Sequence, residues 1–309
     1  MNFQKALTDY LTMRRGFGFK LISEGKLLKT FISFLEQREQ DIITTEFALA
    51  WAKLPTTTAP ARWGRRISVA RSFARYCRAI EPKTEVPSDG LLPCDYKRPS
   101  PCLFQDNDIR QILRASQKRG LNGPFFGQTL HCLFGLLSVT GLRIGEALSL
   151  KIEEVDLNAG ILTVRNTKFG KSRLVPLHDT TVRVLSEYLM QREEFLAGHK
   201  IHYWFVNKLK NQLTYTCVKY HFDIIVKTLD IDCPHERRRP HLHDIRHYFA
   251  RRVLLNWYRD GVDVERNLPK LSAYLGHVET RDTYWYLSAC PELMGAVQRC
   301  LERHWGRLS

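Results

Sequence analysis

Several side chains in this sequence can act together on a phosphodiester bond. Phosphoryl transfer without a metal ion concentrates negative charge on two non-bridging oxygens, and preorganised cations must meet that charge. Arginine suits this role because its planar fork donates two parallel hydrogen bonds and stays charged at any relevant pH. Arg143 lies in the stretch TGLRIGEAL and Arg246 in HDIRH, far along the chain. Folding must therefore bring these two cations to one phosphate.

Three further roles have candidates. Tyr286 offers a nucleophile, but a tyrosine with a pKa near 10 is only about 0.1% ionised at neutral pH and needs a base or a positive field. His243 precedes Arg246 by one helical turn, so both can address one site. Lys168, in an expected hairpin, can protonate the departing 5′ oxygen. His277 can donate a further hydrogen bond to the phosphate.

The motifs that carry these residues closely resemble those of the tyrosine recombinase (phage integrase) family. The family signature is an arginine in a TGLRxxE setting, a lysine in a β-hairpin, His-x-x-Arg, and LGH with a tyrosine nine residues after the histidine. Glu146 also matches the acidic residue one turn after the first arginine. Six catalytic positions match in the family's order: Arg143, Lys168, His243, Arg246, His277 and Tyr286.

This resemblance covers nearly the whole chain and has clear implications. It implies a site-specific DNA recombinase that forms a 3′-phosphotyrosine intermediate and a free 5′-hydroxyl, without metal or nucleotide cofactor. It further implies a Holliday junction and a tetramer on two double-stranded DNA sites, and it allows accessory recombination proteins. The RDTYWY stretch that ends at Tyr286 is similar to recombinases and integrases of mobile elements.

Each assignment has a competing interpretation. Arg143 and Glu146 have the i, i+3 spacing of a surface ion pair on a helix. Lys171 and Arg173 lie close to Lys168, which we prefer because it fits the family's register.

Two tyrosines compete with Tyr286 as the nucleophile. Tyr284 is two residues away and points roughly the opposite way on a helix, so only one of the pair can face the arginines. Tyr274 precedes His277, whereas the nine-residue spacing after His277 favours Tyr286. Tyr284 and Trp285 are then expected to be packing residues.

The histidine-rich region also permits a zinc hydrolase. His243 and His247 have the i, i+4 spacing of a zinc-binding helix, but Asp244 replaces the usual glutamate and no third ligand stands out downstream. The nearby candidate ligands are Cys233, His235 and His241. We expect no metal site, and we interpret His247 as a residue that either supports the active-site side chains or serves the fold.

The charge of the chain indicates a polyanionic partner. The net charge is +15 and the pI about 9.6. Residues 1–98 hold 17 Lys+Arg against 10 Asp+Glu, and the remainder holds 30 against 22, so both halves are expected to contact DNA. A generic basic surface is the alternative. The expected contacts are Arg62, Arg65, Arg66, Arg71, Arg75, Arg78, Lys171, Arg173, Arg237, Arg238 and Arg239.

Two of these groups have a specific context. Between Arg62 and Arg78 there is no acidic residue, and Arg71, Arg75 and Arg78 share one face of an expected helix, although a solvated charged face is the alternative. The run 237–239 favours phosphate contacts over a disordered basic loop.

The cysteines and apolar runs indicate where the protein works. Eight cysteines are scattered with no C-x-x-C pair, which argues against a zinc ribbon and a disulfide framework and favours a reducing cytoplasm. No secretory signal pattern opens the chain, and the apolar run 130–142 is too short for a membrane span and predicts a buried helix. We expect a cytoplasmic, nucleoid-associated protein.

Periodicity and prolines predict two mainly helical domains. Residues 1–80 form a four-helix core-binding domain, 81–101 a proline-rich linker, and 102–309 a catalytic domain whose helices accompany a small antiparallel β-sheet. Together the domains would encircle DNA as a C-shaped clamp. The expected helices are 3–14, one around 27–35, 46–53, 65–80, one opening at Asp106 or Asp108, 130–142, 142–150, 180–197, 215–229, 243–258, 264–275 and 291–304.

Other hypotheses remain open. The apolar spacing in 291–309 predicts a segment that packs on a neighbouring protomer. A type IB topoisomerase would share the tyrosine chemistry without demanding paired sites, and a non-catalytic DNA-binding regulator would share only the basic faces.

Overall fold

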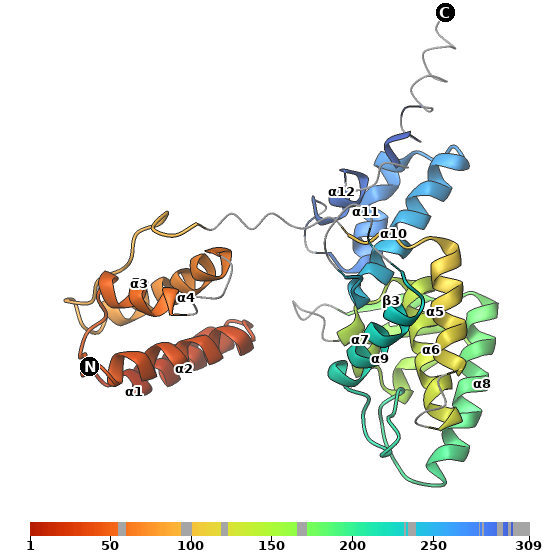
Figure 1. Ribbon diagram of the computed structural model, residues 1–309, viewed down its shortest axis with the longest axis horizontal. Helices are drawn as coiled ribbons and strands as arrows, with labels where there is room; N and C mark the ends of the chain where they lie inside the picture. Colours follow the sequence, from red (N-terminus) through yellow and green to blue (C-terminus); the bar gives the residue numbers. More distant parts are fainter. Residues whose placement is uncertain are drawn as a thin grey trace, which may run out of the picture. The chain divides into compact units, whose positions relative to one another are not determined.

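The protein is mainly helical and divides into two compact units, Met1–Arg98 and Pro99–Ser309 (Figure 1). The computed structural model describes residues 1–54, 60–93, 101–118, 123–165, 172–231, 233, 239–277, 279, 281–288, 293–295 and 298. The predicted fold class, helices with a small antiparallel sheet, is confirmed. No helix in the described ranges has the length and apolar character needed to cross a membrane.

The first unit is built from four helices around an aromatic core. Its elements are α1 (Phe3–Gly16), α2 (Ile22–Glu36), α3 (Thr45–Lys53) and α4 (Pro60–Arg78). Thr44 caps α3, accepting a hydrogen bond from the Phe47 N–H. Phe31 and Trp51 pack with ring centroids 4.8 Å apart. The fourth helix begins five residues before its predicted start, because the first turn of a helix tolerates proline.

Most of the proline-rich segment packs against this first unit. The backbone N–H of Glu85 donates to the Ile43 carbonyl and its carboxylate accepts from the Thr45 N–H, both at 2.8 Å. Leu92 is buried in the same core. Of the segment predicted as the linker, residues 81–92 are therefore attached to the helices before them, and 94–100 lie outside the described residues.

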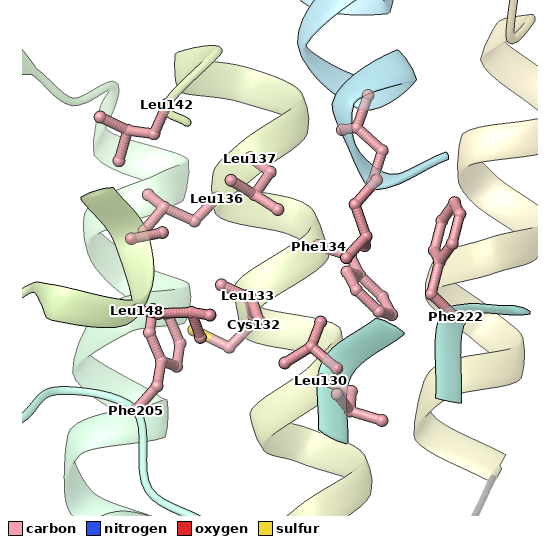
Figure 2. Close-up of a cluster of buried hydrophobic side chains, with 14 of the residues drawn as sticks. Leu130, Cys132, Leu133, Phe134, Leu136, Leu137, Leu142, Leu148, Phe205 and Phe222 are labelled. Carbon is pink, nitrogen blue, oxygen red and sulfur yellow. The ribbon is translucent and has the colours of Figure 1, made fainter. Parts of the chain in front are cut away.

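The second unit surrounds one almost completely buried helix. Figure 2 shows part of its core, to which Leu130, Leu133, Phe134 and Leu137 of α6 and Phe222 of α9 belong, and the rings of Phe134 and Phe222 lie edge to face with centroids 5.7 Å apart. The predicted buried helix over 130–142 is thus confirmed. The helices are α5 (Asp106–Lys118), α6 (Pro124–Thr140), α7 (Ile144–Ser149), α8 (Asp179–Leu196), α9 (Tyr215–Thr228), α10 (Leu242–Arg259), α11 (Val264–Leu275) and α12 (Arg281–Ser288).

Three short strands complete this unit. They are β1 (Val155–Asp156), β2 (Ile161–Val164) and β3 (Arg173–Pro176), paired antiparallel in the order β1-β2-β3. Leu162 pairs with Val175, and both side chains are fully buried. The sheet thus fixes the backbone position of Arg173, the first residue of β3.

The C-terminal region differs from the predicted pattern. Helix α12 was not among the expected helices, since its eight residues carry little apolar periodicity. Leu293 is buried in a cluster with Tyr286 of α12. Most of the predicted helix 291–304, and the trans-packing segment that it would form, lies outside the described residues.

One disulfide corrects the expectation drawn from the scattered cysteines. Cys102 and Cys233 are bonded, with their Cα atoms 5.2 Å apart and a sequence separation of 131 residues. No short-range spacing can signal such a pair, because only the tertiary fold brings the two residues together. The bond joins the start of the second unit to the segment that precedes α10.

Breaking this bond is expected to destabilise the second unit. A Cys233→Ser variant should lose about 2–4 kcal/mol of unfolding free energy relative to the oxidised protein, because a long loop regains entropy in the unfolded chain. Urea denaturation with and without reductant measures the difference. The half-buried free thiol of Cys217 provides the control variant Cys217→Ser. A wild-type midpoint that does not respond to reductant would contradict the prediction.

Candidate active site

The turn between α6 and α7 places Arg143. Gly141 adopts φ 61°, and a Cβ there would lie 2.4 Å from the ring of Phe249. Glycine is therefore required both for the left-handed backbone and for the close approach of α10. Arg143 follows as the N-cap of α7, and Glu146 accepts from its backbone N–H at 3.0 Å and from its Nη1 at 2.9 Å. The i, i+3 ion pair of the competing interpretation thus exists, but Glu146 is buried, and the pair orients the guanidinium.

Arg246 is buried on α10 with only 2% of its surface exposed. Its Nη1 donates to the Gly141 carbonyl and its Nη2 to the Leu275 carbonyl, both at 2.7 Å. Burial lowers the pKa of Arg246 to about 10, while the nearby Tyr286 opposes that shift. The side chain therefore remains a cation at neutral pH.

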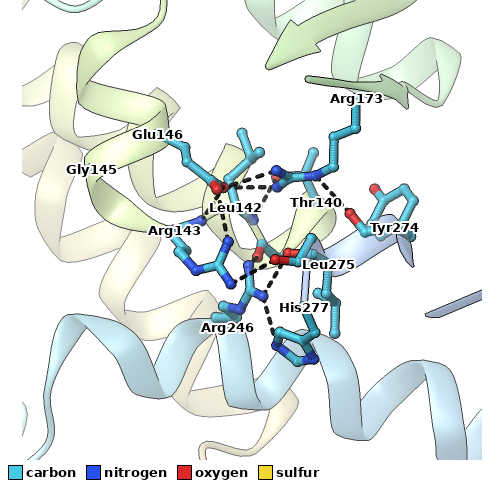
Figure 3. A network of polar contacts seen from close by, with 12 residues as sticks. Thr140, Leu142, Arg143, Gly145, Glu146, Arg173, Arg246, Tyr274, Leu275 and His277 are labelled. Carbon is cyan, nitrogen blue, oxygen red and sulfur yellow. Dashed lines mark hydrogen bonds and ion pairs between the residues drawn. The ribbon is translucent and has the colours of Figure 1, made fainter. Parts of the chain in front are cut away.

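The two arginines converge at the C-terminus of α11. Arg143 Nη2 donates to the Gly276 carbonyl at 2.9 Å, next to the Leu275 carbonyl that Arg246 binds (Figure 3). Gly276 ends the helix with φ 68°. Two guanidiniums distant in sequence are thus held beside each other by consecutive carbonyls.

His277 and Tyr286 lie next to this pair. His277 Nε2 is 2.9 Å from Arg246 Nη2. The Tyr286 ring is nearly parallel to the His277 ring, with centroids 6.1 Å apart, and only 4% exposed. Tyr284, by contrast, is 49% exposed, so it is not the packing residue that we expected. The helical period separates the two tyrosines as predicted.

The remaining rival, Tyr274, is a packing residue. Its ring stacks on Phe249 with centroids 5.7 Å apart, and burial raises the pKa of its hydroxyl to about 12. Its backbone carbonyl accepts a hydrogen bond from Arg173 Nε. Tyr286 is therefore the better nucleophile candidate among the described tyrosines near the arginines.

His247 is a second histidine beside the candidate nucleophile, Tyr286. His243 is exposed, and its ring meets that of His247 edge to face at 4.7 Å. His247 is buried and lies 5.2 Å from the Tyr286 ring. His247 thus contacts both His243 and Tyr286, which fits the first of the two interpretations of this residue, a side chain that supports the active-site residues.

Arg173 has a different role from the predicted DNA contact. Its Nη1 and Nη2 donate to the two carboxylate oxygens of Glu146 at 3.2 and 2.8 Å, and its side chain is 12% exposed. Burial alone would raise the pKa of Glu146, but the hydrogen bonds and charges of Arg173 and Arg143 outweigh it and lower that pKa. The buried carboxylate therefore stays ionised between two arginines. Lys168 and Lys171 lie outside the described residues.

Arg71 is also a correction to the predicted DNA face. It is buried, donates to the carbonyls of Pro87 and Ser88 at 2.7 Å, and pairs with Asp89 at 2.6 Å. The spacing of α4 placed it correctly on one face with Arg75 and Arg78, but the returning segment 87–89 covers that end of the face. Arg71 therefore anchors the segment 87–89 to α4.

The other predicted contacts vary in exposure. Arg66 stacks on Trp51 at 3.8 Å and donates to its carbonyl, while Arg65 pairs with Glu24 at 3.1 Å. Arg237 and Arg238 lie outside the described residues. The exposed members of the set are Arg62, Arg65, Arg75, Arg78 and Arg239.

The residues of the alternative zinc site have other partners. Cys233 is bonded to Cys102, and Asp244 accepts from the backbone N–H groups of His241 and Cys102. In the part of the chain that the structure describes, no three metal-binding side chains gather in one place. His235 lies outside that part.

Comparison with known proteins identifies the family. The description "Phage integrase family" matches residues 103–292. The "Putative integrase/recombinase y4rB" of Sinorhizobium fredii is 44% identical over 98% of both chains. The chain therefore belongs to the phage integrase family of tyrosine recombinases, as its motifs predicted.

Solved structures share the fold. The Tn1549 transposon integrase, in complex with transposon right end DNA, has a TM-score of 0.67 and 17% identity, covering 98% of this chain and 99% of that chain. A lambda integrase tetramer bound to a Holliday junction has a TM-score of 0.62 and 18% identity, covering 92% and 76%. At these identities the likeness concerns the fold alone.

The Arg173–Glu146 pair is expected to contribute strongly to stability. Arg173→Leu should cost about 2–3 kcal/mol of unfolding free energy, because it leaves a buried carboxylate with only one of its two arginines. The control is Arg165→Leu, which removes the exposed partner of Glu154, 3.6 Å away, and should cost less than about 1 kcal/mol. Equal losses in urea denaturation would refute the assignment.

Proposed function

We propose that this protein is a site-specific DNA recombinase that cleaves and rejoins strands through Tyr286. The convergence of Arg143 and Arg246 at the end of α11, with Tyr286 and His277 beside them, carries this proposal. Such a site offers two cations to one phosphate and a phenol next to them.

The charge of the transition state is the first requirement. A guanidinium has five N–H donors, and the described contacts of the Arg143 side chain use its Nη1 and Nη2 once each. Its side chain is 28% exposed, so a phosphate oxygen can reach the remaining donors. Arg246 is buried more deeply than Arg143, and it contributes the electrostatic field of its positive charge. These cations supply the charge stabilisation that a metal ion would otherwise give in the proposed reaction.

The proposed bond changes begin with the attack of Tyr286 on the phosphate. The Tyr286 oxygen attacks phosphorus and loses its proton to His243, while the bond from phosphorus to the 5′ oxygen breaks. Lys168 protonates that oxygen to leave a 5′-hydroxyl, and the strand end becomes a 3′-phosphotyrosine. A 5′-hydroxyl from the partner duplex then gives its proton to Lys168 and attacks this ester, and the released Tyr286 oxygen regains its proton from His243. The bond energy is conserved, so strand exchange through a Holliday junction needs no ATP.

The assembly follows from two duplexes exchanging strands. Each of four cleavages needs one nucleophile, which supports a homotetramer on double-stranded DNA, and a related lambda integrase forms such a tetramer on a Holliday junction. We propose that both units contact DNA and that Arg62, Arg75 and Arg78 bind phosphates in the first. The likeness to a transposon integrase supports a mobile element as the source of the sites. Chromosomal DNA as substrate places the protein in the cytoplasm with the nucleoid, where accessory recombination proteins can join.

Covalent trapping tests the nucleophile. On a nicked suicide substrate, the wild-type protein should form a covalent DNA adduct at residue 286, in buffer containing EDTA as well as without it. Tyr286→Phe should lose the adduct entirely, since it lacks the attacking oxygen, while binding DNA with unchanged affinity. Tyr284→Phe is the matched control, because this tyrosine lies on the same helix but faces solvent.

The results separate the alternatives. An adduct on Tyr284, or one that forms equally with Tyr286→Phe, would overturn the assignment. Binding without any adduct would indicate a regulator, and loss of activity in EDTA would indicate metal chemistry.

Plasmid topology distinguishes a recombinase from a type IB topoisomerase. Once the bound sequence is known, plasmids with two copies of the site should yield deletion or inversion products, because exchange needs two aligned duplexes. Plasmids without the site should keep their supercoils. Relaxation of both plasmids at the same rate, without recombinant products, would instead assign the topoisomerase activity.

A further inference from the structure

A buried threonine contacts the histidine of the proposed active site. Thr283 lies on α12 with no exposed surface, and its Oγ1 is 2.7 Å from His277 Nδ1. It precedes Tyr286 by three residues, so the two side chains share one face of the helix. The helix that carries the candidate nucleophile thus also carries the partner of His277.

The partners of His277 determine where its proton lies. Arg246 Nη2 stands 2.9 Å from His277 Nε2, and a guanidinium can only donate. Nε2 must therefore accept, so the ring is neutral and carries its proton on Nδ1. That proton is donated to Thr283 Oγ1. Arg246 thus donates to His277, and His277 donates to Thr283.

We propose that Thr283 is a positioning residue that holds the His277 ring through Nδ1 in either tautomer and links the docking of α12 to Arg246. This inference rests on the proposed function, since it assigns Thr283 to the same reaction. When α12 is docked, Thr283 accepts from His277 and Tyr286 is buried against its ring. The placement of the nucleophile and the orientation of the His277 ring therefore both depend on the docking of α12.

A hydroxyl suits this position because it can both donate and accept. In the DNA-free protein it accepts the Nδ1 proton. When a phosphate oxygen replaces Arg246 as the partner of Nε2, His277 must donate from Nε2. One proton then leaves Nδ1 for solvent and one is taken up at Nε2, so the ring stays neutral. The Thr283 hydroxyl then turns and donates to Nδ1. Valine, which has the same shape, can serve neither state.

The test compares Thr283→Val with Thr283→Ser. In protein labelled with ¹⁵N-histidine, the wild type and Thr283→Ser should show His277 protonated at Nδ1 without DNA. Thr283→Val leaves the Nδ1 proton without its acceptor, so the ring should no longer be held against Arg246 and should show a mixture of the two tautomers. On the suicide substrate, Thr283→Val should form the covalent adduct about 10- to 100-fold more slowly, as expected for a misplaced active-site group. Thr283→Ser should stay within about threefold of wild type, and DNA affinity should not change.

A matched control separates this role from packing. Thr129 is equally buried on α6 and its Oγ1 donates to the Phe125 carbonyl, so Thr129→Val should leave the tautomer and the adduct rate unchanged. If Thr283→Val does not fold, Thr283→Ala takes its place. An unchanged tautomer or a wild-type adduct rate in the valine variant would overturn the inference. If the wild-type protein forms no adduct, the proposed function fails, but the tautomer measurement still tests Thr283.

Discussion

The second unit depends on the contact of two guanidiniums with two consecutive carbonyls at the end of α11. Like charges repel, and burying them costs several kcal/mol unless hydrogen bonds and opposite charges compensate. Here the carbonyls of Leu275 and Gly276 accept from Arg246 and Arg143, and Glu146 supplies the negative charge. The left-handed glycine at the helix end aims those carbonyls at the arginines. The cations are thus positioned before any DNA is present, which is what electrostatic catalysis requires.

Buried arginines also donate to backbone carbonyls in irregular segments elsewhere in the second unit. Arg192, only 2% exposed, donates to the carbonyls of Ile201, Tyr203 and Trp204 and so anchors the turn after α8. Arg251 donates to the Phe104 carbonyl near the start of the unit. Buried loop carbonyls need donors, and a planar fork can satisfy several at once. A large positive charge therefore overstates the surface available to DNA, because part of it serves the fold.

Much of the fold could be predicted from periodicity and local chemistry. The bounds of α11 agree with the predicted helix 264–275, and α3 ends at Lys53 as the predicted helix 46–53 does. Such features depend on residues within a few positions of one another. The start of α4 was missed because proline stops a helix only in its interior. Helix α12 was missed because eight residues are too few for a clear apolar period, and its burial comes from packing on α10 and α11.

For the site, the sequence by itself determined the residue types and their order. The helical period of 3.6 allowed only one of Tyr284 and Tyr286 to face the arginines, and the nine-residue spacing after His277 favoured Tyr286. Only the tertiary structure decided which charges face inward. Arg71 and Arg173 look like surface cations in sequence, yet segments distant along the chain cover them and supply their acceptors. The same holds for the Cys102–Cys233 bond and the His277–Thr283 contact, because partner choice depends on distances that a linear pattern does not contain.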